Sequence, residues 1–331
     1  MPQHHRIRTP FAAACAALLT LAAPAATAAT ADEYPARPLR IIVGFPPGGA
    51  TDLVARIIAP KLGESLKQQV IVDNRSGANG TIGAEIAAKS TPDGYNLHLA
   101  TLGALVISPA ITRVPYDPLQ DFATISMTVQ LQNMFLVHPT LTAKTIPELI
   151  LLARQKPGGL NYASSGLGSP GHLAGELFKT MAKVDMTHIP YKGGGPALSD
   201  LLGGQLPVFV AVISTGVPPV KAGRAVALAV TGAKRSPALP GVPTVAEAPG
   251  MKGYEASNWY GMVAPAGTPP AIIKRLQQQL HAALGAADIR EALLSRGIDP
   301  DSSTPEEFSA YIRSETAKWE KVIRTANLKP N

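Results

Sequence analysis

Three turns rich in glycine hold the residues of this chain that could bind an anion. The first is Phe45-Pro-Pro-Gly-Gly-Ala-Thr-Asp52, the second runs from Tyr162 to His172, and the third from His188 to Pro196. Each separates an apolar run that predicts a strand from a segment with helical spacing. Free N–H groups at a helix N-terminus attract anions, so each turn is a candidate anion site. The alternative for the first turn is a tight strand–helix turn that needs glycine only for a positive φ.

The second turn also contains a G-x-G-x-x-G pattern, formed by Gly166, Gly168 and Gly171. A dinucleotide fold needs an acid at the end of the following strand, roughly 20 residues further on. Asp185 has that spacing, but it precedes the predicted strand Met186–Ile189. The pattern therefore argues weakly for a nucleotide, and we expect no cofactor.

Serine hydrolysis is the enzymatic alternative. Ser164, Ser165 and Ser169 lie in the second turn, and two histidines, His172 and His188, lie close in sequence. A nucleophile elbow has the pattern G-x-S-x-G, which none of these serines fits. We therefore expect no enzyme, and keep an exported Ser/His esterase-like hydrolase as the alternative.

Metal and thiol chemistry have little support in the sequence. Cys15 is the only cysteine and lies in the N-terminal segment. The later histidines have no ligand spacing on one predicted element; they are His98, His138, His172, His188 and His281. We expect no metal site.

Two further features have open interpretations. Lys192, in the third turn, could contact or steer an anion, or could be a solvated loop lysine. Trp259 and Tyr260 lie in a predicted strand and could line a cleft or belong to the core.

Residues 1–31 have the pattern of a cleaved signal peptide. Arg6 and Arg8 precede a short apolar core, Phe11 to Ala23, and small residues allow cleavage near Ala28 or Ala31. An anchoring helix is the alternative, but the core is too short to span a membrane. We expect a periplasmic protein.

Composition predicts a globular chain, since 46% of residues are hydrophobic and 16% are charged. The formal charge is +7, of which residues 1–31 contribute +2, so the remainder is mildly basic. That balance suits an acidic small molecule. No dense run of Lys and Arg with interleaved aromatics is present, so we expect no nucleic-acid partner.

The elements that must position these turns alternate between strand and helix. Leu39–Phe45, Ala50–Leu66, Val70–Asp73, Thr81–Ser90 and Asn96–Ala100 read as β-α-β-α-β, which implies a parallel sheet. Two further strands are predicted at Ile125–Val129 and Asn133–His138, after which a second, similar set begins and a helical C-terminal part follows. We predict an α/β fold with two lobes. The chain would cross between them near Gln132 and Gly253, giving lobes of residues 32–132 with 253–331, and 133–252.

Several motifs together resemble one known family, the Bug-type substrate-binding proteins of tripartite tricarboxylate transporters. The resemblance runs from about Tyr34 to the C-terminus. The motifs that carry it are Phe45-Pro-Pro-Gly-Gly-Ala-Thr-Asp52, Val72-Asp-Asn-Arg-Ser-Gly-Ala-Asn-Gly80, Pro92-Asp-Gly-Tyr95, His172-Leu-Ala-Gly-Glu-Leu-Phe178, Pro190-Tyr-Lys-Gly193 with Asp200-Leu-Leu-Gly-Gly-Gln205, Leu228-Ala-Val-Thr-Gly232 and Ala264-Pro-Ala-Gly-Thr-Pro269.

This resemblance implies a periplasmic receptor with a two-lobed Venus flytrap fold, type II-like, and a ligand cleft between the lobes. It implies that the first and second turns hold one ligand carboxylate, and that the partners are a small carboxylate and membrane transporter subunits. We expect a monomer; a receptor used for sensing is an alternative. The ligand-binding residues it implies are Phe45, Pro47, Gly48, Gly49, Ala50, Ser164, Ser165, Gly166, Gly168 and Ser169.

Two positions depart from the family pattern. Many members have Asn at the position of Leu167 and Asp at the position of Ala211. The second departure removes a possible partner for a ligand ammonium group. We therefore expect a mono- or dicarboxylate without an amino group, with an apolar or aromatic body as one option.

Overall fold

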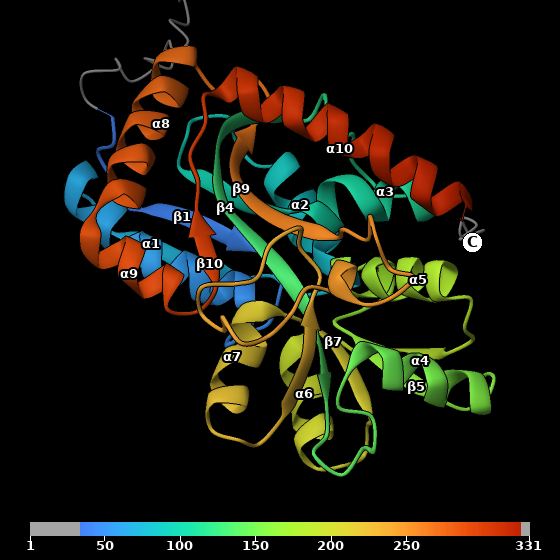
Figure 1. Cartoon of the computed structure of the whole chain (residues 1–331). Helices are drawn as coiled ribbons and strands as arrows, with labels where there is room; N and C mark the ends of the chain where they lie inside the picture. Colours follow the sequence, from blue (N-terminus) through green and yellow to red (C-terminus); the bar gives the residue numbers. More distant parts are fainter. Residues whose placement is uncertain (1–33, 326–331) are drawn as a thin grey trace, which may run out of the picture.

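The computed structural model describes residues 34–325, in which helices cover a mixed sheet (Figure 1). The predicted signal peptide lies outside the described residues. The strands within this part of the chain are β1 (Leu39–Val43), β2 (Val70–Asn74), β3 (Asn96–Thr101), β4 (Phe122–Val137), β5 (Asn161–Ser164), β6 (Thr187–Pro190), β7 (Val208–Val212), β8 (Val226–Val230), β9 (Ser257–Pro265) and β10 (Ile298–Pro300).

Strand order shows how the two lobes are joined. The order is β2-β1-β3-β9-β4-β7-β5-β6, and β8 and β10 also pair with β4. β1 is parallel to β2 and β3, and β5 is parallel to β6 and β7, whereas β4 is antiparallel to β7, β8, β9 and β10. The parallel sheet predicted for the first five elements is present, with antiparallel β9 added beside β3.

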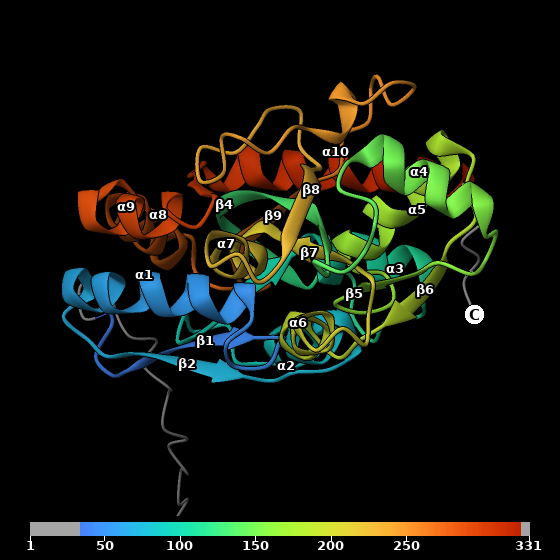
Figure 2. The same cartoon turned by 60° about the horizontal axis from the view of Figure 1, so that its bottom comes forward.

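The helices lie on the faces and ends of this sheet (Figures 1 and 2). Two further short helical turns lie at Ala78–Gly80 and Val245–Glu247, and a wide turn at Gly103–Ile107 leads into α3. The helices are α1 (Ala50–Leu66), α2 (Thr81–Ala88), α3 (Ser108–Ile111), α4 (Ile146–Gln155), α5 (Pro170–Ala182), α6 (Gly194–Leu202), α7 (Ile213–Lys221), α8 (Pro270–Gly285), α9 (Ala287–Leu294) and α10 (Pro305–Thr325).

Helix α1 has the predicted bounds because its signals are local. Val54, Ile58 and Leu62 recur on one side and are buried. Asp52 lies in the first turn, where an acid suits the helix N-terminus. Lys67 ends the helix with φ of 53°, and its N–H reaches back to the carbonyls of the last turn. This helix therefore starts where the first glycine-rich turn ends.

The two strands predicted at Ile125–Val129 and Asn133–His138 are wrong as separate elements. They form one 16-residue strand, β4. β4 pairs with β9 from Phe122 to Gln132, and with β7 and β8 from Asn133 to Val137. The chain thus changes partners at this point without a break in the strand. The residue limits of the lobes given above stay a prediction.

Three elements were missing from the prediction, namely α3, α7 and β10. Helix α7 contains Pro218 and Pro219, which argue against a helix when only the sequence is read. β10 has three residues and exists because it pairs with β4.

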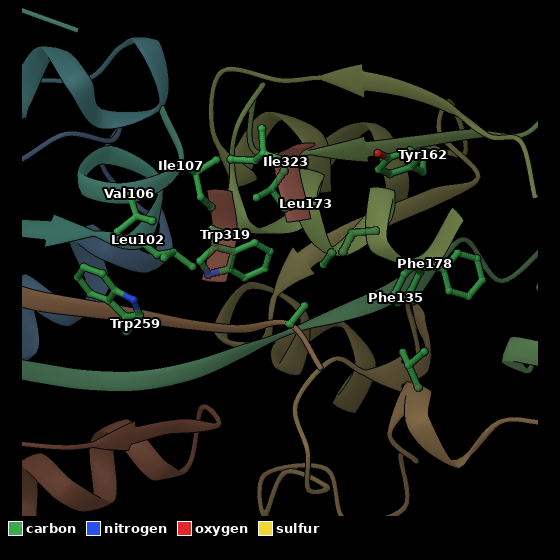
Figure 3. Close-up of a cluster of buried hydrophobic side chains, with 14 of the residues drawn as sticks. Leu102, Val106, Ile107, Phe135, Tyr162, Leu173, Phe178, Trp259, Trp319 and Ile323 are labelled. Carbon is green, nitrogen blue, oxygen red and sulfur yellow. The ribbon is translucent and has the colours of Figure 1, made fainter. Parts of the chain in front are cut away.

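One buried hydrophobic cluster extends from the first lobe into the second (Figure 3). It includes Leu102 and Trp259 together with Tyr162 and Phe178, which follow β4 in the chain. The C-terminal helices return to the first lobe, where α8 and α9 lie against α1 and α10 lies along β4. Trp259 belongs to this core and packs edge-on against Phe308 of α10.

Candidate ligand-binding site

A pocket lies where the first turn faces the N-terminus of α6, with the ends of β7 and β9 behind it. We call this the cleft pocket; its empty space, including part of the mouth, is about 630 Å³. It is lined by Phe45, Pro46, Pro47, Gly49, Ala50, Thr51, Thr101, Ser165, Pro170, Gly193, Gly194, Gly195, Pro196, Phe209, Val212, Thr215, Asn258 and Tyr260. Two helix N-termini from different lobes therefore meet at one cavity.

Unpaired backbone donors lie at both of these helix ends. Within residues 34–325, the N–H groups of Ala50 and Thr51 in α1 have no acceptor, and neither do those of Gly194 and Gly195 in α6. Such groups, with the positive ends of two helix dipoles, favour an anion. The cleft pocket therefore offers an anion several backbone donors.

No charged side chain of the described residues lines the cleft pocket. Its polar side chains are hydroxyls and one amide, and Phe209 and Val212 add an apolar wall. Burial raises the pKa of Tyr260 to about 12, although hydrogen bonds with Thr51 and Asn258 act in the opposite direction. Tyr260 therefore stays a neutral phenol. The site suits one anionic group attached to an uncharged body.

Asp52 fixes the shape of the first turn from behind. Its carboxylate accepts a hydrogen bond from the Gly48 N–H at 2.9 Å and from Asn74 Nδ2 at 2.9 Å. Arg56 Nε lies 2.9 Å from the same carboxylate, and Asn74 Nδ2 also donates to the Phe45 carbonyl at 3.0 Å. Burial raises the pKa of Asp52, but the bonds from Arg56, Gly48 and Asn74 together hold it below its ordinary value. The turn is thus held by an ionised acid.

The second turn faces the cleft pocket mainly through Ser165. Its backbone is tied to the third turn, because Gly193 N–H donates to the Ser165 carbonyl at 3.0 Å. Gly166 and Leu167 face a neighbouring cavity instead. Ser169 is the N-cap of α5 and accepts from the His172 N–H at 3.2 Å. Gly168 N–H donates to His172 Nδ1 at 3.1 Å.

Ser164 is buried and turned away from the cleft pocket. Its Oγ lies 2.7 Å from His188 Nε2 and donates to the Gly166 carbonyl at 2.8 Å. The His188 ring stacks on His172 with 4.0 Å between centroids. Burial lowers the pKa of His188 to about 3 and that of His172 to about 4. Both imidazoles are neutral packing groups of the second turn at neutral pH.

The predicted site residues thus fall into three groups. Phe45, Pro47, Gly49, Ala50 and Ser165 line the cleft pocket, and Gly166 lines the neighbouring cavity. The other four line neither of these two cavities and shape the turns from within: Gly48, Ser164, Gly168 and Ser169. That these ten residues bind a ligand stays a prediction.

Sequence reasoning missed several lining residues. Gly193, Gly194 and Gly195 belong to the third turn, which was a candidate anion site, but they were not among the predicted ligand-binding residues. Tyr260 lines the pocket, whereas its neighbour Trp259 lies in the core. Each of the two interpretations in the sequence analysis, cleft lining or core, therefore holds for one of these aromatics. Phe209, Val212 and Thr215 reach the site only because β7 and α7 meet behind it, which no local pattern indicates.

Across the described part of the chain, no three His, Cys, Asp or Glu side chains are grouped as metal ligands. None of the helices between residues 34 and 325 combines the length and hydropathy of a membrane span.

A family model described as a tripartite tricarboxylate transporter family receptor matches residues 54–328. The chain belongs to this family. The Bug-type resemblance is thereby confirmed, and solved structures of similar proteins add to it. "R. palustris Rpa4515 with adipate" is 39% identical, with a TM-score of 0.87 over 90% of this chain and 100% of that one.

Two further family structures show the same fold. MatC (Rpa3494) from Rhodopseudomonas palustris, solved with bound malate, is 31% identical with a TM-score of 0.83, over 88% of this chain and 100% of that one. The periplasmic binding protein BugD is 32% identical with a TM-score of 0.85, over 90% of this chain and 100% of that one. The predicted two-lobed periplasmic-binding-protein fold is confirmed. Tripartite tricarboxylate transporter family receptors are periplasmic solute-binding proteins.

Proposed function

We propose that this protein is a periplasmic receptor that binds a small carboxylate without an amino group in the cleft pocket. The observation that carries the proposal is the meeting of two helix N-termini, α1 and α6, whose first N–H groups have no acceptor among the described residues. A carboxylate has two oxygens that accept from such donors. Its site residues are those predicted above, together with Gly194 and Gly195.

Related structures support the ligand class. Two similar proteins were solved with adipate and with malate, which are both carboxylates without an amino group. In this chain Ala211 is fully buried, and no acid among the described residues lines the cleft pocket. An ammonium group would therefore be left without a counter-charge, which is costly in a buried site.

The receptor would be exported by a signal peptide cleaved near Ala28 or Ala31 and would act as a monomer. Closure of the lobes around the carboxylate would present both of them to the membrane subunits of a tripartite tricarboxylate-type transporter. A receptor that serves sensing is the alternative, and binding of a ligand alone does not separate the two roles.

A Ser/His hydrolase is the rival proposal, and one geometric feature favours it. Ser164 Oγ and His188 Nε2 are within hydrogen-bond distance, as a nucleophile and base require. However, Ser164 is fully buried, and no described carboxylate forms a hydrogen bond with His188. The pair shapes the second turn, and we propose a protein without catalytic activity.

Gly195 allows a sharp test of the binding site. A Cβ added to Gly195 would meet no atom within 4 Å, so Gly195→Leu should fill the pocket without disturbing the fold. In a thermal-shift screen of carboxylates, a ligand at 100 times its Kd should stabilise the wild-type protein by about 2.7 kcal/mol. Gly195→Leu should remove that shift, while Gly285→Leu, also in open space, should keep it.

Two outcomes would contradict the proposal. One is a screen in which only cations or neutral sugars stabilise the protein. The other is turnover of an activated ester that disappears in Ser164→Ala.

A further inference from the structure

A second cavity adjoins the cleft pocket and has a different chemical character. The two cavities share Phe45, Pro46, Ser165 and Gly193 as a common wall. The second cavity, which we call the outer cavity, lies between the Ser76–Gly80 turn, the chain after α3 and the second and third turns. Its empty space, with its mouth, is about 1470 Å³. A ligand held in the cleft pocket could therefore extend past Phe45 and Pro46 into it.

The outer cavity carries two cations, one from each side of the cleft. Arg113 follows α3, and Lys192 lies in the third turn; both line this cavity and both are exposed. Neither forms an ion pair or a side-chain hydrogen bond with any residue between 34 and 325. No Asp or Glu of the described residues lines the cavity. Two positive charges there face space without a protein counter-charge.

An apolar surface lies beside these cations. Leu167 projects from the second turn and is 50% exposed, and Ile111 lies in the same lining. Gly166 and Gly168 flank Leu167 with φ values of 147° and 70°, which glycine adopts readily. A methylene chain that crossed the outer cavity would cover part of the exposed Leu167 surface, which is favourable.

We propose that Arg113 and Lys192 form a second carboxylate subsite, so that the ligand is a dicarboxylate whose two carboxylates are joined by an unbranched apolar chain. This inference rests on the proposed function, because the first carboxylate occupies the cleft pocket. The first carboxylate is bound by backbone N–H groups and the second by two side-chain cations. Since Arg113 and Lys192 come from opposite sides of the cleft, the second carboxylate also links the lobes.

The test compares dicarboxylates with monocarboxylates of the same length. The probes are the straight-chain series from succinate to suberate and the matching series from butyrate to octanoate. Affinity and dissociation rate are measured for the wild-type protein, for Arg113→Gln/Lys192→Gln, and for the control Lys221→Gln/Arg290→Gln. The control pair has the same charge change and lines neither cavity.

The expected result is that the wild type binds the best dicarboxylate at least about tenfold more tightly than its monocarboxylate partner. Arg113→Gln/Lys192→Gln should remove that preference, mainly through faster dissociation, and the control should keep it. Equal binding of both series would overturn the inference, as would a loss confined to the association rate, which indicates steering alone. Binding only of aromatic carboxylates would also overturn it, yet leave the proposed function intact. A protein that bound no carboxylate at all would contradict the proposed function itself.

Discussion

Asp52 is an acid placed directly behind a turn that is proposed to bind an anion. Its carboxylate is paired with Arg56 and is stabilised by hydrogen bonds from Gly48 and Asn74. The Gly48 N–H therefore already donates a hydrogen bond within the turn and is not available to a ligand. The donors left for a ligand are those of Ala50 and Thr51, one residue further into the helix.

Asp52→Asn should weaken both the fold and ligand binding. The variant loses the charge of a carboxylate that is 4% exposed, and hydrogen bonds to charged groups contribute about 1.5–3 kcal/mol. We expect the free energy of unfolding to fall by about that amount, and ligand affinity to fall because the turn loses its fixed shape. Urea unfolding and calorimetric titration measure the two effects. Equal stability of the two proteins at pH 7 would contradict this account.

The pH dependence of that difference follows from the pKa of Asp52. Because the folded protein holds this pKa below the ordinary value of about 3.9, the unfolded chain binds the proton more readily. The stabilisation is therefore complete above pH 4 and is lost as the pH falls. The stability difference between the wild type and Asp52→Asn should be constant from pH 5 to 7 and shrink below pH 4.

At this scale the sequence identifies turns better than it identifies contacts. The family resemblance implied Gly49 and Ala50 as ligand-binding residues, in a turn that the sequence marks locally, and both line the pocket. The resemblance implied Ser164 and Ser169 in the same way, but their hydroxyls bond within the second turn. Which way a side chain points depends on neighbours from other elements, and His188 is such a neighbour.

Strand β9 and helix α10 approach each other closely at Gly261. A Cβ on Gly261 would lie 2.0 Å from the ring of Phe308, which is fully buried. Only glycine allows the helix to lie this close to the strand. Since β9 also carries Tyr260 and Asn258 into the cleft pocket, the position of α10 supports the site from behind.

Gly261→Ala should therefore displace Phe308 and destabilise the protein. Overpacking of a core usually costs about 1–3 kcal/mol, and a contact this short should lie at the upper end. Thermal or urea unfolding would show the loss. The matched control is Gly285→Ala, where the new methyl group meets open space and stability should not fall. Equal stability of the two variants would show that α10 can shift without cost.

Elements were predicted where their signals are local and were missed where they are not. Helix α1 has an apolar stripe and a first-turn acid, and its bounds were predicted correctly. β4 was divided in two because its burial pattern changes near Gln130 and Gln132, where the strand leaves one set of partners for another. No single-sequence pattern reports that a strand belongs to two lobes.

The two lobes touch each other directly as well as through β4. Asn79 Nδ2 donates to the Gly168 carbonyl at 2.7 Å and lies 3.1 Å from Ser108 Oγ. Asn79 has a φ of 55°, which Asn tolerates better than most residues. The amide thus joins the Ser76–Gly80 turn to the second turn across the cleft. It holds the two sides of the outer cavity together.

Removal of this bridge should favour separation of the lobes. Asn79→Gly keeps the positive φ at no steric cost, and Asn79→Asp keeps the shape but cannot donate. Both variants should bind the ligand several-fold more weakly, because a neutral hydrogen bond contributes about 1 kcal/mol. Small-angle scattering of the ligand-free variants should show a larger radius of gyration than the wild type. An unchanged radius and affinity would mean that the bridge does not hold the lobes.

A fold with two lobes follows from the sequence because strand–helix alternation restarts after residue 138. The shared core does not, since it joins residues that are far apart in the sequence, such as Leu102 and Tyr162. Such contacts between distant residues leave no periodic trace in either segment.

The unbroken course of β4 determines how this receptor can open. Between Gln132 and Asn133 there is no loop to pivot on, so any rotation of one lobe must be absorbed as added twist and bend along a hydrogen-bonded ribbon. Twisting such a ribbon costs elastic energy, and the force that restores its shape grows with the angle between the lobes. A receptor whose lobes are joined by this ribbon would open through a small range of angles and close again without a further driving force. Its cleft would then have the same shape each time it closes.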